Sequence, residues 1–156
     1  SAMSNLTKQD INTMPVMSEE HLALATKAEE VVRTFHKTLC CTQHTLHAGM
    51  YSRTLFIPKG TTVVGVIIKV PTTLVINGNL NVFLGGSVKN YDGYHVVAAP
   101  ANRKQVVHAM EDSYVTLSFP TNAKTIEDAE RDMTDESHRL QSREKESFNL
   151  INITGE

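Results

Sequence analysis

Seven histidines and two adjacent cysteines are the residues of this sequence best suited to binding a metal ion or moving a proton. Cys40 and Cys41 are direct neighbours, a spacing that rarely allows a disulfide between the two, and no Cys/His spacing typical of zinc surrounds them. We therefore predict two small buried residues in a reducing compartment, with a reactive thiol as the alternative. His44 and His47 fall on opposite faces of an extended segment and predict no strong metal pair.

Glu111 and Asp112 form a carboxylate pair, the kind of pair that can act in general acid/base catalysis. Ser113 follows them, and because such a run is typical of a turn, a turn is the interpretation we prefer. The sequence has no Gly-rich phosphate loop before a helix, no Gly-x-Ser-x-Gly elbow and no His-Glu-x-x-His motif. It therefore gives little support to these three enzyme chemistries.

A set of cations and hydroxyl groups could bind an anion. The predicted ligand-binding residues are Tyr51, Arg53, Tyr94, Arg103 and His108. Arginine suits this role because its planar guanidinium binds a carboxylate or phosphate through two parallel hydrogen bonds. His108 could instead be a general base or a metal ligand, or a histidine that only bonds to backbone or solvent. For Arg103 and its neighbour Lys104, a solvated loop is equally compatible with the sequence.

Length and composition predict one folded domain with polar extensions. The chain has 156 residues, of which 40% are apolar and 21% charged, as in soluble single-domain proteins. Its longest apolar run, residues 63–68, is far below the roughly 20 residues of a membrane helix, so we expect no membrane partner. The net charge of −2 argues against general nucleic-acid binding.

Charge is segregated along the chain. Residues 42–126 carry a net charge of +4 and the two flanks together carry −6. The acidic flanks could dock on the basic centre, or the centre could attract an anionic ligand. The plainer interpretation is that the lysines keep the outer faces of strands soluble.

Residues from Ser18 to about 36 or 37 have helical periodicity. Ser18 is a good N-cap, and Glu19 and Glu20 follow it in the first turn, where acidic side chains are favourable. Apolar residues then recur at spacings of three and four, which predicts one buried stripe that leaves Glu29 mostly outside it. The stripe consists of Leu24, Ala28, Val31, Val32, Phe35 and Leu39. It predicts packing on the rest of the protein or on a second subunit.

From Thr45 the period changes to two, which indicates antiparallel β structure. We predict strands at residues 45–48, 51–57, 62–70, 73–76, 79–84, 87–91, 94–98, 105–110 and 114–119. Many short strands at this spacing are typical of a sandwich or barrel. Asn77-Gly78 predicts a type I′ hairpin turn, which would pair Val75 with Leu80.

The C-terminal part becomes helical and then polar. Thr125 predicts an N-cap for a short helix from Ile126 to about Met133. Residues 134–147 are dominated by charged and polar groups, which predicts a solvated helix or a disordered tail. Residues 148–153 alternate imperfectly and could add a strand to a sheet edge.

Six short motifs carry a resemblance to a known family. They are Gly49–Thr54, Pro58–Thr61, Ile76–Asn79, Gly93–Val96, Pro100–Lys104 and Glu111–Asp112. In order and spacing, residues 44–125 resemble a cupin, the small double-stranded β-helix or jelly-roll barrel. More narrowly, they are similar to cupin-type proteins of bacteriophages and prophages. The resemblance implies a homodimer or a higher homo-oligomer.

Metal-binding cupins hold their ion with histidines and a glutamate. The resemblance maps these ligand positions onto Val66, Ile68, Thr72 or Thr73, and His108 or Met110. Valine and isoleucine cannot ligate a metal and threonine is a poor ligand. We therefore expect a barrel without a metal centre and without a cofactor.

We expect four parts along the chain. They are a tag remnant (Ser1-Ala2) and flexible arm at 1–17, an amphipathic helix at 18–40, a cupin-like barrel at 44–120, and a short helix with a polar tail at 121–156. The leading hypothesis is a cytoplasmic, non-enzymatic phage or prophage protein that acts in assembly or interacts with a phage or host protein. One alternative is the binding of a small anionic, nucleotide-like molecule in the barrel. The other is a metal-dependent enzyme that uses His108 with His44, His47 or His95.

Overall fold

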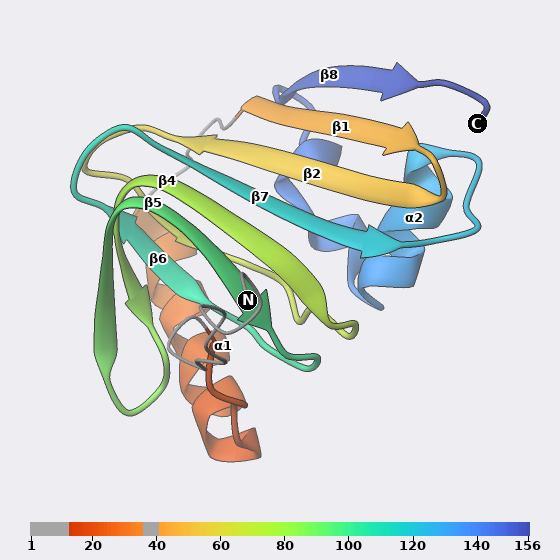
Figure 1. Cartoon of the computed structure of the whole chain (residues 1–156). Coiled ribbons are helices and arrows are strands. Elements are labelled where there is room, and N and C mark those ends of the chain that lie inside the picture. Colours follow the sequence, from red (N-terminus) through yellow and green to blue (C-terminus); the bar gives the residue numbers. More distant parts are fainter. Residues whose placement is uncertain (1–12, 36–40) are drawn as a thin grey trace, which may run out of the picture.

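The computed structural model describes residues 13–35 and 41–156, with only the backbone for residues 31–35. Its helices are α1 (Glu19–Phe35) and α2 (Ile126–Met133), and its strands are β1 (Cys41–His47), β2 (Met50–Ile57), β3 (Thr62–Val64), β4 (Thr72–Phe83), β5 (Val88–Ala99), β6 (Val106–Ala109), β7 (Ser113–Pro120) and β8 (Phe148–Ile153). Two 3-10 turns, η2 (Ser137–Arg139) and η3 (Gln141–Arg143), lie between α2 and β8. Figure 1 shows strands that curl into a barrel, with α1 beside β6 and α2 below β1 and β2.

The eight strands form one continuous sheet that folds over into two parts, here called the larger and the smaller sheet, which share the long strands β4 and β5. The larger sheet has the order β8-β1-β2-β7-β4-β5 and the smaller has the order β3-β6-β4-β5. In the larger sheet Leu74 of β4 lies opposite Leu117 of β7, and in the smaller sheet Val82 of β4 lies opposite Val107 of β6. When β4 and β5 are each counted as two strands, β2 to β7 have the order of an eight-stranded jelly roll. The predicted mainly β jelly-roll barrel is therefore confirmed, with β1 and β8 as an extension of one sheet.

β4 passes from one sheet to the other at Gly78. This residue has a φ of 145°, in a region that favours glycine, and it lies opposite Gly93 of β5. A Cβ atom on Gly78 would lie 2.2 Å from Oγ of Ser113, the first residue of β7. The bend therefore requires a residue without a side chain, as glycines at barrel corners often do.

The hairpin predicted at Asn77-Gly78 is wrong. Asn77 lies opposite Tyr94, and the pairing with β5 continues along the whole of β4. The chain reverses instead between Leu84 and Ser87, where the N–H of Leu84 donates to the carbonyl of Ser87. An Asn-Gly pair permits a tight turn, but glycine also permits a strand to bend. The local sequence does not distinguish these two outcomes, because the choice depends on the strands that lie alongside.

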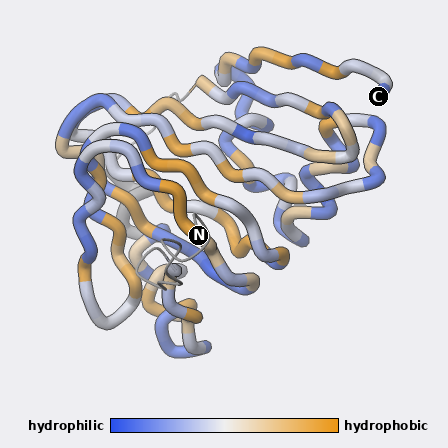
Figure 2. Tube along the Cα trace, in the orientation of Figure 1, coloured by the Kyte–Doolittle hydropathy of each residue, from blue (hydrophilic) through white to orange (hydrophobic). Residues whose placement is uncertain are grey.

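Apolar side chains from both sheets fill the interior of the barrel. The buried set is Met14, Ile57, Val63, Leu74, Ile76, Leu80, Val82, Leu84, Tyr91, Val97, Ala99 and Ala109. Figure 2 shows hydrophobic residues along the middle of the strands that enclose this core. Met14 belongs to the predicted arm, yet it is 2% exposed, and its N–H donates to the carbonyl of Ala98. Residues 13–17 therefore pack on the barrel, and residues 1–12 lie outside the described residues.

α1 begins where the sequence predicts. The hydroxyl of Ser18 accepts a hydrogen bond of 3.1 Å from the N–H of His21, which satisfies one of the free donors of the first turn. The helix packs against β3 and β6. The later stripe positions, from Val31 to Leu39, lie outside the described side chains, so this part of the prediction stays a prediction.

The described part of α1 buries a different face from the predicted stripe. Leu24 is 45% exposed, whereas Ala25 is fully buried. Glu29, predicted to lie mostly outside the stripe, is 3% exposed and pairs with Nζ of Lys104 at 2.6 Å. The inward face of the helix therefore includes a buried ion pair with a distant loop.

The C-terminal part differs from the predicted tail. Thr125 caps α2 as predicted, with its hydroxyl accepting the N–H of Asp128 at 3.1 Å. Residues 134–147 are neither a solvated helix nor disordered, because they form η2 and η3 and bury Leu140. β8 pairs in parallel with β1, with Asn149 opposite Thr42. The predicted edge strand at 148–153 is thus confirmed.

α2 and the C-terminal turns cover the extended end of the larger sheet with a second apolar cluster. Its buried members are Leu46, Tyr51, Val66, Phe119, Ile126, Ala129, Met133 and Leu140. Val66 joins this cluster because β3 ends at Val64, six residues before the predicted end of that strand. Within the described residues, no helix is long and apolar enough to span a membrane.

Replacing Gly78 with alanine should destabilise the protein by about 2–4 kcal/mol, since the new Cβ would clash with Ser113. Gly93→Ala is the matched control. Gly93 also has a positive φ, of 94°, but nothing lies within 4 Å of its Cβ position, so only backbone strain of about 1–2 kcal/mol is expected. Urea unfolding of both variants measures the difference. If both variants lose the same free energy of unfolding, the contact with Ser113 adds no cost beyond backbone strain.

Candidate functional site

The predicted ligand residues do not converge on one site. Tyr51 and Arg53 lie together on the inner face of β2, and both are buried. Arg103 is buried in the loop between β5 and β6, and Tyr94 is 68% exposed on β5. His108 on β6 hydrogen-bonds through Nδ1 to the hydroxyl of Thr62 at 2.8 Å. The structure therefore brings together only the first two, and a ligand role for the five stays a prediction.

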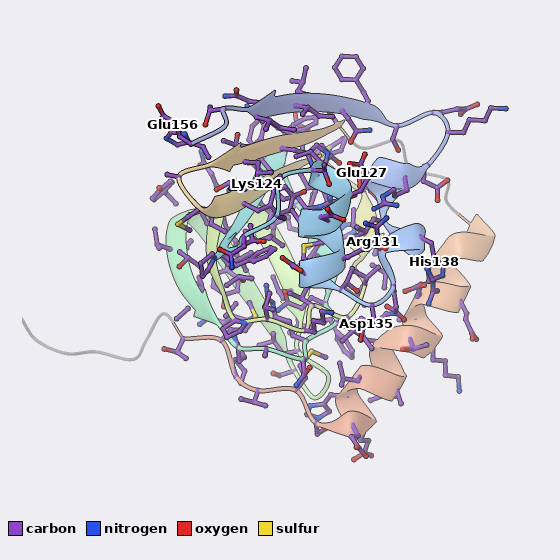
Figure 3. All side chains as sticks on the ribbon, turned by 90° about the vertical axis from the view of Figure 1, so that its right-hand side faces the viewer. Lys124, Glu127, Arg131, Asp135, His138 and Glu156 are labelled. Carbon is purple, nitrogen blue, oxygen red and sulfur yellow. The ribbon has the colours of Figure 1, made fainter. Side chains whose placement is uncertain are left out.

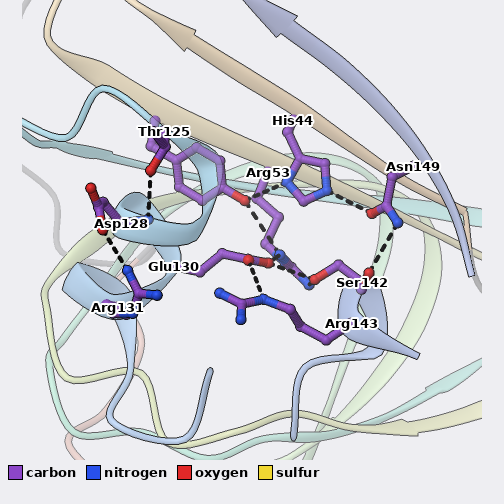
Figure 4. A network of polar contacts seen from close by, with 10 residues as sticks. His44, Arg53, Thr125, Asp128, Glu130, Arg131, Ser142, Arg143 and Asn149 are labelled. Atoms are coloured by element: carbon purple, nitrogen blue, oxygen red, sulfur yellow. Dashed lines mark hydrogen bonds and ion pairs between the residues drawn. The ribbon is translucent and has the colours of Figure 1, made fainter. Parts of the chain in front are cut away.

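Tyr51 and Arg53 belong to a buried polar network centred on Glu130 of α2 (Figure 4). Nη1 of Arg53 lies 2.8 Å from Oε2 of Glu130, and Nε of Arg143 donates to Oε1 at 2.8 Å. The hydroxyl of Ser142 donates to Oε2 at 2.5 Å and accepts from Nη2 of Arg53 at 3.0 Å. One carboxylate thus receives three donors from β2 and η3.

His44 extends the network to β8. Arg53 donates to the hydroxyl of Tyr51 at 3.3 Å, and this hydroxyl lies 2.6 Å from Nδ1 of His44. Nε2 of His44 lies 2.8 Å from Oδ1 of Asn149, whose Nδ2 donates to the carbonyl of Ser142 at 3.0 Å. Because this amide orientation presents an acceptor to Nε2, the imidazole carries its proton on Nε2 and accepts at Nδ1.

The ionisation states follow from burial and from these bonds. Burial alone would raise the pKa of Glu130, but hydrogen bonds from Ser142 and Arg143 and the charge of Arg53 lower it below its ordinary value. Burial lowers the pKa of His44 and raises the pKa of Tyr51. At neutral pH the network therefore contains two arginine cations, one carboxylate, a neutral imidazole and a neutral phenol.

The geometry of this network suits a structural role, in which it holds the C-terminal segments against the sheet. Its donors and acceptors are directed at one another and link β2, α2, η3 and β8, which lie far apart in the sequence. Sequence reasoning missed Glu130, Ser142, Arg143 and Asn149 as members. One signal was available for Glu130, since it shares the helical spacing of the buried Ile126 and Met133. The other three lie in segments whose position only the folded chain defines.

Arg103 and Lys104 are not in a solvated loop, since they are 2% and 1% exposed. Lys104 pairs with Glu29 of α1, and Arg139 of η2 also contacts Glu29. Within the described residues Arg103 donates to neutral acceptors, namely the carbonyls of Pro100 at 2.8 Å and Val70 at 3.5 Å and the hydroxyl of Thr72 at 2.6 Å. Burial lowers the pKa of Arg103 to about 10, so this guanidinium remains charged at neutral pH.

The residues considered as metal ligands in the sequence analysis make other contacts in the structure. Val66 and Ile68 lie between β3 and β4 and pack in the second apolar cluster. His44 belongs to the Glu130 network, His47 bonds to the hydroxyl of Thr154 and His95 bonds to the carbonyl of Asp92. Within residues 13–35 and 41–156, no three His, Cys, Asp or Glu side chains are close enough to hold a metal ion.

The outer face of the larger sheet carries no charged side chain. Residues directly opposite each other on paired strands share a face, and the outward set is residues 41, 43, 45 and 47 of β1, 50, 52, 54 and 56 of β2, 73, 75 and 77 of β4, 94, 96 and 98 of β5, 114, 116, 118 and 120 of β7, and 148, 150 and 152 of β8. None of these is Asp, Glu, Lys or Arg. We call this surface the uncharged face.

Large apolar side chains and paired hydroxyl groups occupy the uncharged face. Met50, Tyr94, Val96, Tyr114, Phe148 and Leu150 on it are each more than 40% exposed. A shallow depression of about 310 Å³ is lined by Cys41, Gln43, Thr54, Phe56, Tyr114 and Leu150. Cys41, predicted to be buried, is half-buried with a free thiol, and Cys40 lies outside the described residues. Charged side chains gather elsewhere, for instance over α2, where Figure 3 labels Glu127 and Arg131.

No protein-family model and no curated protein matches the sequence. Solved structures that overlap with part of the chain include an RmlC-like cupin with a double-stranded β-helix fold from Methanocaldococcus jannaschii, which is 14% identical, covers 55% of this chain and 84% of its own, and has a TM-score of 0.44. A double-stranded β-helix protein from Klebsiella pneumoniae is 13% identical over 59% and 84% of the two chains, with a TM-score of 0.45. The EutQ protein of Clostridium difficile is 14% identical over 64% and 70%, with a TM-score of 0.45.

Replacing Glu130 with glutamine should destabilise the protein by about 3 kcal/mol at neutral pH, because two arginines lose their common counter-charge. The pKa of Glu130 is lower in the folded than in the unfolded chain, so its stabilisation is present above about pH 4.3 and is lost as the pH falls through the folded pKa. We expect thermal unfolding of the wild type and of Glu130→Gln to show that their difference in stability becomes smaller as the pH falls from neutral to acidic.

Asp128→Asn is the control for this experiment. Asp128 also pairs with an arginine, Arg131, but both side chains are more than half exposed. Its removal should change stability by less than about 1 kcal/mol at any pH. If Glu130→Gln behaves like this control, the network does not anchor the C-terminal part.

Proposed function

We propose that this protein is a non-enzymatic, cupin-like jelly-roll module that acts in assembly, and that it associates with itself through the uncharged face. The observation that carries the proposal is the contrast between its interior and its surface. Apolar side chains fill the barrel, where a small-molecule site of this architecture would be expected. Six of the twelve exposed large apolar side chains in the described part of the chain lie instead together on one broad sheet face, the uncharged face.

The size of the uncharged face supports this role. Six neighbouring strands at a spacing of about 4.8 Å, with six to seven residues of about 3.3 Å each, give a patch of roughly 25 by 20 Å. Covering it on two copies would remove roughly 1,000 Å² of surface from water, near the lower limit of specific protein interfaces. A two-fold arrangement suits an uncharged patch, because a charged residue near the axis would meet its own copy.

The finer parts of the proposal come from the sequence. The resemblance of residues 44–125 to cupin-type proteins of bacteriophages and prophages supports a phage or prophage origin and a role in the host cytoplasm. A phage or host protein could bind the same face as a second partner. The cupin resemblance maps metal-ligand positions onto Val66 and Ile68, and these side chains cannot bind a metal ion. This supports a barrel that works without a metal centre.

Placing a charge on the uncharged face should weaken self-association at least about tenfold, because a lysine would have to be buried without a partner. Val96→Lys is the test and Val88→Lys the matched control. Both valines lie on β5 and are 46% and 61% exposed, but Val88 lies in the half of β5 that pairs in the smaller sheet. Sedimentation over a range of concentrations compares the variants, with thermal unfolding as a check on folding. A wild-type chain that stays monomeric at high concentration would overturn the proposal.

Capture of a small anionic molecule is the second candidate, and the neutral surroundings of Arg103 favour it. An anion bound there would offset a buried charge that otherwise costs stability. A thermal-shift panel of nucleotides and other anionic metabolites tests this idea, since a ligand of the folded state raises the melting temperature. The shift should be absent in Arg103→Met and retained in Lys89→Met, an exposed position. No shift with any compound counts against this candidate.

A further inference from the structure

β8 is an edge strand with unusual side chains. Within the described chain it pairs with β1 on one side and with no strand on the other. It contains no charge and no proline, and four of its six residues are exposed apolar groups, namely Phe148, Leu150, Ile151 and Ile153. Such an edge is a template for another strand, and soluble proteins usually protect it with a charge, a proline or a bulge.

In the described part of the chain, other edges of the sheets are covered by neighbouring segments, whereas the edge at β8 is not. Thr13 forms a parallel bridge with Ala98 at the far edge of the larger sheet, and Met14 donates a backbone hydrogen bond to the same residue at 2.9 Å. α1 packs against β3, the last strand of the smaller sheet. Among the described segments, nothing covers the second edge of β8.

The backbone groups that point away from the protein can be identified. The N–H of Thr154 donates to the carbonyl of Leu46 at 3.2 Å, and the carbonyl of Glu156 accepts from Ala48 at 2.9 Å. Even-numbered residues therefore face β1. Because successive residues of a strand point to opposite sides, the N–H and C=O groups of Asn149, Ile151 and Ile153 face the open edge.

We propose that the open edge of β8 pairs in antiparallel fashion with β8 of a second copy of this chain, with Ile151 opposite Ile151. In this register Asn149 lies opposite Ile153 of the second copy. The two residues of each opposed pair exchange two hydrogen bonds, as hydrogen-bonded residue pairs do in antiparallel sheets. All three outward N–H groups and all three outward C=O groups of each strand are then satisfied.

Self-complementarity is the reason for choosing a second copy as the occupant. The same three residues supply every donor and every acceptor, so a two-fold axis perpendicular to the sheet closes the contact. This axis keeps the outer faces of both sheets on one side, and it brings the exposed Ile151 side chains together. The inference rests on the proposed self-association, but it names a contact surface separate from the middle of the uncharged face.

Ile151→Pro tests the backbone contact directly. Proline removes the outward N–H of residue 151 and leaves the ladder to β1 intact, which is the position where an edge strand tolerates proline. Ile151→Val is the matched control, because it trims the side chain and keeps the N–H. In sedimentation, Ile151→Pro should weaken self-association at least about tenfold, and Ile151→Val should stay close to wild type.

A second measurement keeps the test decisive if the proline variant folds poorly. Amide hydrogen exchange of the wild-type chain should show residue 151 protected at high protein concentration and exposed on dilution. Residue 152, which faces β1, should be protected at both. Exchange at residue 151 that does not depend on concentration would overturn the edge pairing.

The outcomes separate this inference from the proposed function. If Val96→Lys weakens association but Ile151→Pro, folded as wild type, does not, the edge pairing fails and the assembly role stands. A wild-type chain that is monomeric at every concentration removes both. Weakening by Ile151→Pro with no effect of Val96→Lys supports the β8 contact and overturns the uncharged face as the interface.

Discussion

The close approach of Gly78 to Ser113 is the contact on which the two-sheet arrangement depends. Before this point β4 pairs with β7, and after it with β6. Both pairings require β7 to begin where β4 bends, with no Cβ between them. A larger residue would push β7 away from the bend and open the corner of the barrel, so the apolar interior would no longer be enclosed by two sheets.

Burial in this protein takes two chemically different forms. The barrel interior is apolar and needs no directional contacts. The surrounding helices are held by buried charges, with Glu130 joining α2 to β2 and η3, and Glu29 joining α1 to the loop at Lys104. Buried ion pairs add little net stability compared with apolar packing, but losing one partner is costly. They therefore fix where the helices sit more than they stabilise the fold.

The surface indicates more about function than the interior does. The uncharged face and the open edge of β8 both belong to the larger sheet, while charged residues lie over α2 and the turns. A second copy that pairs along β8 would extend the uncharged face without a break, since the two-fold axis keeps both outer faces on one side. One sheet would then provide both contacts of an assembly.

Local interactions made part of this structure predictable from the sequence. The caps at Ser18 and Thr125 depend on residues three positions away, and the alternation of the strands reflects a period of two. Alternation of apolar and polar residues also predicted the edge strand at 148–153. Only the tertiary structure decided that Gly78 bends a strand instead of closing a hairpin, and that Glu29 and Glu130 are buried. Arg53 and Glu130 are 77 residues apart, and the burial of such charges depends on partners that no local pattern specifies.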